Sequence, residues 1–234
     1  RNAYFAVMNL RPDGDLRRTW KDGVAKFNAY LEDYAFMAEG LMTLFETTGE
    51  FRWLTKALAF TEQMIAEFWD EESGGFFFTG KSHENLIVRS KDFFDNATPS
   101  GNSVAAMVLL KAAVFTGKER YRNLATATLR EIADQARRYP SGFGYALSAA
   151  DFLLSTPKEI AIIGSNPLDI QPMIQEAWSR YLPNKVVAAT FGLDLLPLWE
   201  NRSMIEGQPT AYVCEHYACK QPVTDVSELA KQLR

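Results

Sequence analysis

The first two thirds of the chain alternate between two kinds of helical segment. The segments at 33–47, 103–115 and 143–154 are apolar on almost every side, a pattern typical of helices that are buried all round. The segments at about 50–69 and 119–138 place charged residues between apolar ones at helical spacing, which predicts helices with one side in water. The predicted order is therefore inner, outer, inner, outer, inner.

The turn that joins an inner helix to an outer helix occurs twice. Residues 48–53 read Thr-Gly-Glu-Phe-Arg-Trp, and residues 116–121 read Thr-Gly-Lys-Glu-Arg-Tyr, 68 positions later. Self-similarity at a fixed offset indicates stacked helical hairpins. Because the inner helices have almost no polar face, an outer ring of helices must cover them. This favours part of an (α/α) toroid over an open solenoid.

The pattern changes after Pro157. Short apolar runs at 159–164, 185–189 and 210–214 predict strands, and residues 169–181 suit a helix. The expected domains are therefore a helical-hairpin barrel segment, 1–156, and a small α/β subdomain, 157–234. Residues 1–30 are expected to form an incomplete edge with one short strand. The chain starts at Arg1 without Met, which suggests a fragment.

Composition excludes some classes of partner. The net charge is −4 with acids and bases mixed along the chain, so nucleic acid is not an expected partner. No apolar run has membrane-spanning length, so we expect no membrane partner either.

Two cysteines in 234 residues make a reducing compartment the default, and we expect a cytoplasmic protein. Cys214 and Cys219 are expected to be reduced and unligated, with at least Cys214 buried. Together with His216 they lack a standard zinc spacing, so no metal and no other cofactor is expected.

Parallel inner helices would bring their N-termini, and the loops that lead into them, to one end of the barrel. We interpret Asp33, His83 and Asp95 as candidate acid/base groups there, because carboxyl and imidazole groups transfer protons near neutral pH. Candidate substrate-binding residues at the same end are Glu32, Tyr34, Glu84, Asn96, Ser100 and Asn102.

These candidates also have structural interpretations. Asp33 could cap the first inner helix, and Ser100 or Asn102 could cap the second. His83 could be an ordinary loop residue. Asp95 does not fit a capping position, and Asp151, inside an apolar helix, needs a polar partner.

Several segments in order resemble one known family. They are residues 29–36, 74–77, 83–84, 99–106 and 211–214, with 218–219. They are similar to the C-terminal third of the YyaL-like family, also called spermatogenesis-associated protein 20-like. The resemblance implies a thioredoxin-like domain followed by an (α/α)6 barrel like those of N-acylglucosamine 2-epimerases and six-hairpin glycosidases. It also implies that the thioredoxin-like domain and the first hairpins lie outside this chain and would be its partners.

Two functions follow from the resemblance and the residues together. The first is a carbohydrate-active barrel segment, epimerase-like or glycosidase-like, with a saccharide ligand. The second is a non-catalytic binding or scaffold module that supports a thioredoxin-like redox domain. The end of the barrel that carries the candidate residues is rich in carboxylates and aromatic residues, which favours the first function. The scarcity of His weakens an epimerase interpretation, because proton transfer on both faces of a sugar needs two bases.

Overall fold

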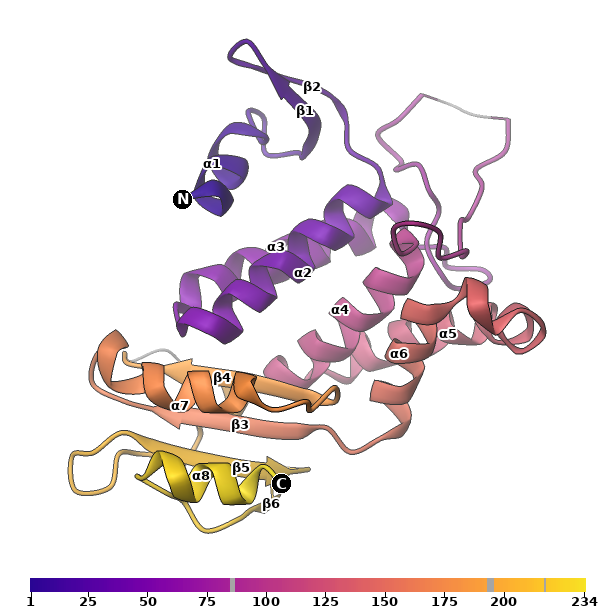
Figure 1. Cartoon of the computed structure of the whole chain (residues 1–234). Helices are drawn as coiled ribbons and strands as arrows, with labels where there is room; N and C mark the ends of the chain where they lie inside the picture. Colours follow the sequence, from indigo (N-terminus) through magenta and orange to yellow (C-terminus); the bar gives the residue numbers. More distant parts are fainter. Residues whose placement is uncertain (85–86, 193–195, 217) are drawn as a thin grey trace.

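The computed structural model describes residues 1–84, 87–192, 196–216 and 218–234. Over these residues the fold is mainly α with some β structure, as the sequence predicts (Figure 1). The elements, in chain order, are α1 (Asn2–Asn9), β1 (Arg17–Lys21), β2 (Val24–Asn28), α2 (Leu31–Thr48), α3 (Phe51–Phe68), α4 (Gly101–Thr116), α5 (Glu119–Arg138), α6 (Gly144–Leu154), β3 (Lys158–Ile163), α7 (Pro167–Ser179), β4 (Lys185–Thr190), β5 (Thr210–Glu215), β6 (Ala218–Cys219) and α8 (Val226–Gln232), with 3-10 turns at Pro140–Gly142 and Pro197–Trp199.

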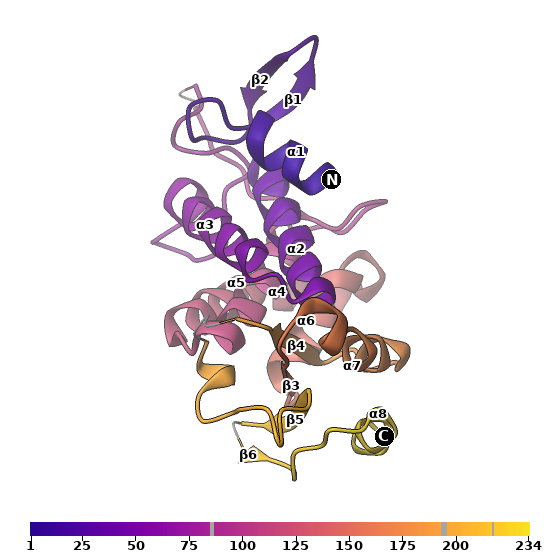
Figure 2. The ribbon, with the colours of Figure 1, turned by 90° about the vertical axis from the view of Figure 1, so that its left-hand side faces the viewer.

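The apolar helices α2, α4 and α6 form an inner layer, and α3 and α5 cover it from outside (Figures 1 and 2). Gly101, at the start of α4, lies against Leu31 at the start of α2. Phe45 and Phe115, near the two C-termini, have ring centroids 5.5 Å apart. The N-terminal ends of α2 and α4 lie together, and so do their C-terminal ends. The prediction that 33–47 and 103–115 are parallel neighbours is therefore confirmed.

The two repeated turns have the same structure, which confirms the 68-residue repeat of the hairpins. Gly49 and Gly117 end α2 and α4 with left-handed φ values of 70° and 67°. Each is preceded by a threonine whose hydroxyl donates to a carbonyl four residues back, Thr48 to Leu44 and Thr116 to Ala112. A glycine is required at this position because a Cβ strains a positive φ.

The C-terminal region is an α/β unit whose sheet has the order β4-β3-β5-β6. β3 pairs with β4 in parallel and with β5 in antiparallel orientation, so the predicted strands are confirmed. One face of the sheet packs against α7 and α8, with Ile160, Val187 and Leu229 in its core. The other face packs on the C-terminal ends of α2 and α4, where Ala188 and Trp199 join the main core.

The N-terminal edge contains more structure than the sequence predicts. The expected single strand is a hairpin of β1 and β2 around Asp22 and Gly23, both with positive φ, and α1 precedes it. The hairpin and α1 lie at the N-terminal end of α2, opposite the α/β unit (Figure 2).

The expectation of two reduced cysteines is wrong, because Cys214 and Cys219 form a disulfide. β5 and β6 pair in antiparallel register with these two residues directly opposite each other, at a Cα–Cα distance of 3.9 Å. Their spacing in sequence does not reveal this, because the pairing depends on where the hairpin turns. Burial of Cys214 is confirmed, since its side chain is 1% exposed.

Candidate functional site

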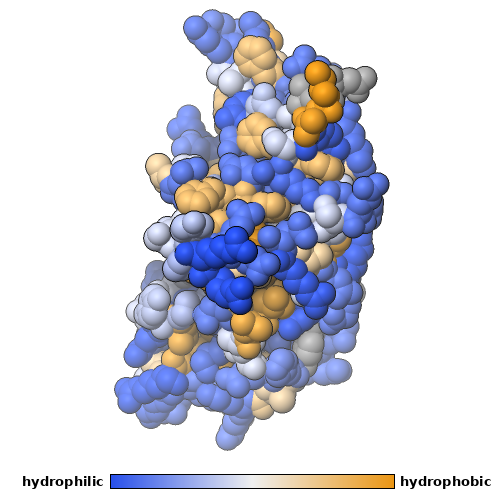
Figure 3. Space-filling view, turned by 90° about the vertical axis from the view of Figure 1, so that its right-hand side faces the viewer, coloured by the Kyte–Doolittle hydropathy of each residue, from blue (hydrophilic) through white to orange (hydrophobic). Residues whose placement is uncertain are grey.

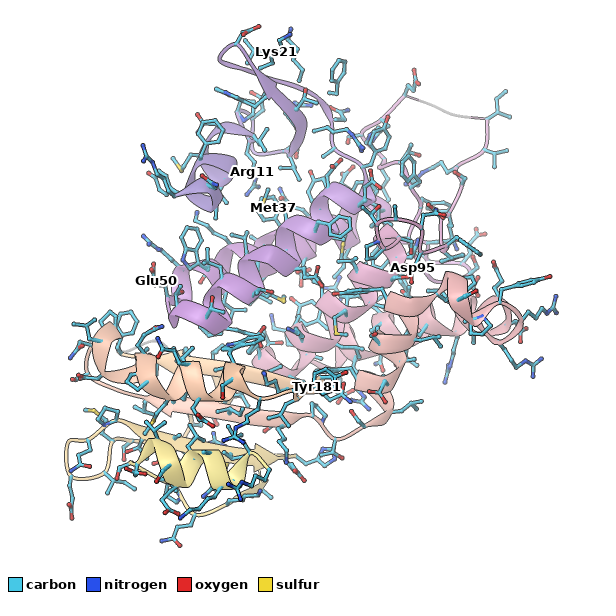
Figure 4. All side chains as sticks on the ribbon, viewed as in Figure 1. Arg11, Lys21, Met37, Glu50, Asp95 and Tyr181 are labelled. Atoms are coloured by element: carbon cyan, nitrogen blue, oxygen red, sulfur yellow. A yellow bond between two sulfur atoms is a disulfide. The ribbon has the colours of Figure 1, made fainter. Side chains whose placement is uncertain are left out.

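The predicted site residues gather at the N-terminal end of the inner helices. The Leu31 N–H donates to the Phe78 carbonyl, so the long loop that contains His83 is attached to the start of α2. Figure 4 shows Asp95 beside the starts of α4 and α6, while Glu50 lies at the opposite end of the helical layer. The α/β unit closes that opposite end, so it does not cover the candidate site.

Glu32 and Asp33 share one cation. Arg18, on β1, places its guanidinium 2.8 Å from Glu32 Oε1 and 3.1 Å from Asp33 Oδ2. Asp33 also accepts the Tyr30 backbone N–H at 2.8 Å. It therefore helps to cap α2 from the first turn, as the third helical residue, and not from the N-cap position that the sequence interpretation gave it, because the helix begins two residues earlier, at Leu31. Burial raises the pKa of the Asp33 carboxyl despite the nearby Arg18.

Tyr34 lies beneath this surface and is 4% exposed. Its hydroxyl accepts the Leu16 N–H at 3.1 Å, and its ring packs against Phe60 and Phe68. This side chain attaches the N-terminal edge to the hairpin of α2 and α3.

His83 is a half-buried member of an aromatic cluster. Its Nδ1 accepts the Gly80 N–H at 3.0 Å, and its ring contacts Tyr30 and Phe68 at 5.1 and 6.5 Å between centroids. Its Nε2 is shielded from solvent and has no hydrogen-bond partner within the described residues. The adjacent Glu84 is exposed.

Asp95 does cap a helix, contrary to the sequence interpretation. Its carboxylate accepts the N–H groups of Tyr145 and Ala146, in the first turn of α6, at 2.8 and 3.2 Å. It also accepts the Ser100 N–H at 2.8 Å. A cap supplied from 50 positions away is invisible to a local sequence rule. Asn96, next to it, is exposed.

Asn102 and Ser100 are buried and use their polar atoms on the protein. Asn102 accepts the Phe76 N–H at 2.7 Å and donates to the carbonyls of Phe76 and Asp92 at 2.9 Å each. Ser100 caps α4 by accepting the Ser103 N–H at 3.1 Å. These bonds hold the loop before α4 against the helix start.

A second polar group lies on the inner helices, and the sequence interpretation did not select it. The Tyr145 hydroxyl on α6 donates to Glu39 on α2, and Glu39 is half-buried. Burial raises the pKa of Glu39, opposed by nearby Lys111 on α4. A charged residue with apolar neighbours along a helix is the signal that could have revealed Glu39, Glu46 and Lys111.

An open cavity of about 390 Å³ lies on the exposed side of α2, next to Asp33. Its lining is mostly apolar, with Phe36, Met37 and Leu41 from α2 and Leu10 and Leu16 from the N-terminal edge. A mostly apolar cavity with a few polar groups at its rim is the usual form of a small-molecule site. Met37 marks this side of α2 in Figure 4.

The described residues contain no group of His, Cys, Asp and Glu side chains with metal-binding geometry. Asp151 is exposed on α6, so its position does not require a polar partner, although Asn184 donates to it at 2.7 Å. In the part of the chain that the structure describes, every helix is too short or too polar to span a membrane.

The fold and site define a class of protein built from helical hairpins, with parallel inner helices and a small α/β unit at one end. Over 212 residues the chain is 36% identical to human spermatogenesis-associated protein 20 and 34% identical to the Rattus norvegicus protein of the same name. These alignments cover 87% of the chain. The chain belongs to the spermatogenesis-associated protein 20-like family, as its motifs indicate.

The aligned region is 27% of the length of each mammalian protein, so the chain spans about a quarter of these relatives. A Caenorhabditis elegans protein described as uncharacterized is 26% identical over 242 residues, which is 97% of the chain and 32% of that protein. No model of a protein family matches the chain.

Proposed function

We propose that the chain is a segment of an (α/α)6 toroid that binds and transforms a carbohydrate. The observation that carries the proposal is the Glu39 carboxyl on the inner helices, whose pKa is raised by burial and which accepts a hydrogen bond from Tyr145. A carboxyl group that keeps its proton at higher pH can serve as a general acid toward a glycosidic or ring oxygen.

One edge of the helical layer has an uncovered apolar surface, which supports the proposal of a toroid. An apolar groove of about 380 Å³ lies between α5 and α6, lined by Leu129, Ile132, Ala146, Leu147 and Ala150. The side of the molecule that carries the 70–98 loop, α5 and α6 has separate hydrophobic areas among hydrophilic side chains (Figure 3). A further hairpin from the rest of the protein would cover such an edge and enclose the Glu39 side of the inner helices.

The proposed site joins Glu39 to the residues at the N-terminal end of the same helices. Asp33 supplies a second carboxyl with a raised pKa, and His83 supplies a ring nitrogen. Asp95, Ser100 and Asn102 hold the loops in place through their backbone hydrogen bonds. Glycosidases usually work with a pair of carboxyl groups, which Glu39 and Asp33 would supply in the complete barrel, and a hydrolase needs no second histidine.

The test is a screen of an intact protein that contains this chain against mono- and oligosaccharides, by binding and by turnover. We expect turnover, and we expect Glu39→Gln to lower kcat by about 10²- to 10⁴-fold because the amide cannot transfer a proton. Glu131→Gln, an exposed change on α5, is the matched control and should leave kcat unchanged. Failure of the intact protein to bind any sugar would favour the alternative, a non-catalytic module that supports a thioredoxin-like redox domain.

A further inference from the structure

The disulfide at the edge of the α/β sheet has one accessible and one inaccessible sulfur. Cys219 lies on the short edge strand β6. It is exposed and lines an open cavity of about 600 Å³. Cys214, on β5, is 1% exposed. A thiolate must reach a sulfur along the S–S axis to break the bond, so this geometry directs attack to Cys219.

A guanidinium group lies against both sulfurs. Arg202 Nη2 is 3.1 Å from Cys219 Sγ and 3.4 Å from Cys214 Sγ. Its Nη1 donates to backbone carbonyls, the shortest being that of Leu198 at 2.5 Å. Arg202 takes part in none of the ion pairs between the described residues, and the other charged groups lining the same cavity are Glu200 and Lys220.

This arrangement suits a thiolate better than a disulfide. A disulfide sulfur is a weak hydrogen-bond acceptor, so it gains little from an arginine. A thiolate carries a full negative charge, and a nearby arginine lowers the pKa of a thiol and makes it a better leaving group. In addition, the two cysteines are five positions apart in the sequence, so the bond closes a short loop. A short loop restricts the unfolded chain less than a long one, and the disulfide therefore stabilises the fold less.

We propose that Cys214–Cys219 is a site of thiol–disulfide exchange that a dithiol partner reduces at Cys219. One thiolate of the dithiol attacks Cys219 Sγ, a mixed disulfide forms, and Cys214 Sγ leaves with the electron pair as a thiolate beside Arg202. The second thiol of the partner loses its proton and attacks the partner sulfur of the mixed disulfide. Cys219 leaves as a thiolate, the partner becomes a disulfide, and two electrons have moved to the chain.

The test measures reduction of the chain by dithiothreitol at fixed pH, with the free thiols alkylated and counted by mass spectrometry. Arg202→Gln should slow reduction about three- to tenfold, the change expected when the pKa of a leaving thiol rises by one or two units. Arg202→Lys keeps the charge and should remain closer to the wild-type rate. Arg180→Gln, which removes an arginine paired with Glu176 elsewhere in the α/β unit, should have no effect.

A second pair of variants tests the direction of attack and does not depend on Arg202. In Cys214→Ser the remaining Cys219 thiol should react with oxidised glutathione, whereas in Cys219→Ser the buried Cys214 thiol should react at least about tenfold more slowly. An Arg202→Gln protein that folds and is reduced at the wild-type rate would overturn the proposal. So would faster reaction of Cys214 than of Cys219, or two free thiols in the chain after treatment with diamide.

Discussion

Glu46 shows how a single charged residue joins the two parts of the fold. It lies on the inner helix α2 and is completely buried. Its Oε2 accepts a hydrogen bond from Lys111 on α4 at 2.8 Å, and its Oε1 accepts the Val187 N–H of β4 at 3.1 Å. One carboxylate therefore connects two inner helices to the sheet.

We expect Glu46→Ala to lower the free energy of unfolding by about 3–5 kcal/mol, because it leaves the half-buried Lys111 ammonium and the buried Val187 N–H without their acceptor. Urea unfolding followed by circular dichroism measures this. Glu228→Ala, which breaks the exposed pair with Lys231, should cost less than about 1 kcal/mol. Equal losses of unfolding free energy in the two variants would contradict the role of Glu46 in joining the helices to the sheet.

Asp70 and Lys91 form a second informative pair, where the long loop leaves α3. Lys91 Nζ lies 2.7 Å from Asp70 Oδ2, and both side chains are 13% exposed. The hydrogen bond from Lys91 holds the pKa of the Asp70 carboxyl well below its usual range.

A carboxyl group with a lowered folded pKa stabilises the fold above its unfolded pKa of about 4, and this contribution disappears as the pH falls through the folded value. We therefore expect Asp70→Asn to lower the melting temperature at pH 7 and to differ less from the wild type as the pH falls below about 4. Thermal unfolding between pH 3 and pH 7 measures this. Asp134→Asn, on exposed α5, is the control, and a difference for Asp70→Asn that persists unchanged at pH 3 would refute the expectation.

At the scale of elements, three glycines lie in different environments, two at the hairpin turns and one within a helix. Gly49 and Gly117 both have positive φ, but a Cβ on Gly49 would also lie 2.7 Å from Ile170 Cδ1 on α7. Gly40, inside α2, has ordinary helical backbone, and a Cβ there would meet nothing within 4 Å.

We expect Gly117→Ala to cost about 1 kcal/mol from backbone strain alone, and Gly49→Ala to cost more because α7 must also shift. Gly40→Ala should stabilise the protein by about 0.5–1 kcal/mol because alanine favours the helix. Chemical denaturation of the three variants tests this order. A Gly40→Ala protein less stable than Gly117→Ala would contradict it.

At the scale of the whole molecule, the helical segment and the α/β unit share one core. Phe45 of α2 contacts Phe115 of α4 and Trp199 of the C-terminal region, at ring-centroid distances of 5.5 and 6.3 Å. Trp199 also donates to the Ala188 carbonyl of β4 at 2.9 Å. The division at residue 157 stays a prediction about sequence organisation.

We expect the chain to unfold in one cooperative transition, because neither part can separate without exposing this aromatic cluster. Trp199→Ala should destabilise the whole chain by about 3–5 kcal/mol, through the cavity that it leaves. Calorimetry and circular dichroism should give a single, coincident transition that moves as a unit in the variant. Two transitions, with only the later one shifted, would show that the parts fold separately.

The sequence predicted much of this fold and the end of it at which the candidate residues meet. The buried and amphipathic helices, the repeated glycine turns and the three strands follow from periodicity, because burial of apolar surface acts on every turn of a helix. The gathering of Glu32, Asp33, His83 and Asp95 follows from the parallel inner helices. The cytoplasmic location was an expectation from composition and stays one.

Only the tertiary structure decided which polar groups pair with one another. Tyr145 bonds to Glu39 across 106 positions, Asp95 caps α6 from a distant loop, and Cys214 meets Cys219 because β6 pairs with β5. Such contacts depend on the distance and direction of a few atoms, which residue type and spacing leave open. The sequence by itself determined which stretches of the chain are apolar, because hydrophobic burial needs only apolar area. Only the fold decided how far each is covered: α6, predicted to be buried all round, exposes Leu147 and Leu154 because no further helix lies over that side within the described residues. Hydrogen bonds and the disulfide likewise need a partner that folding alone brings into place.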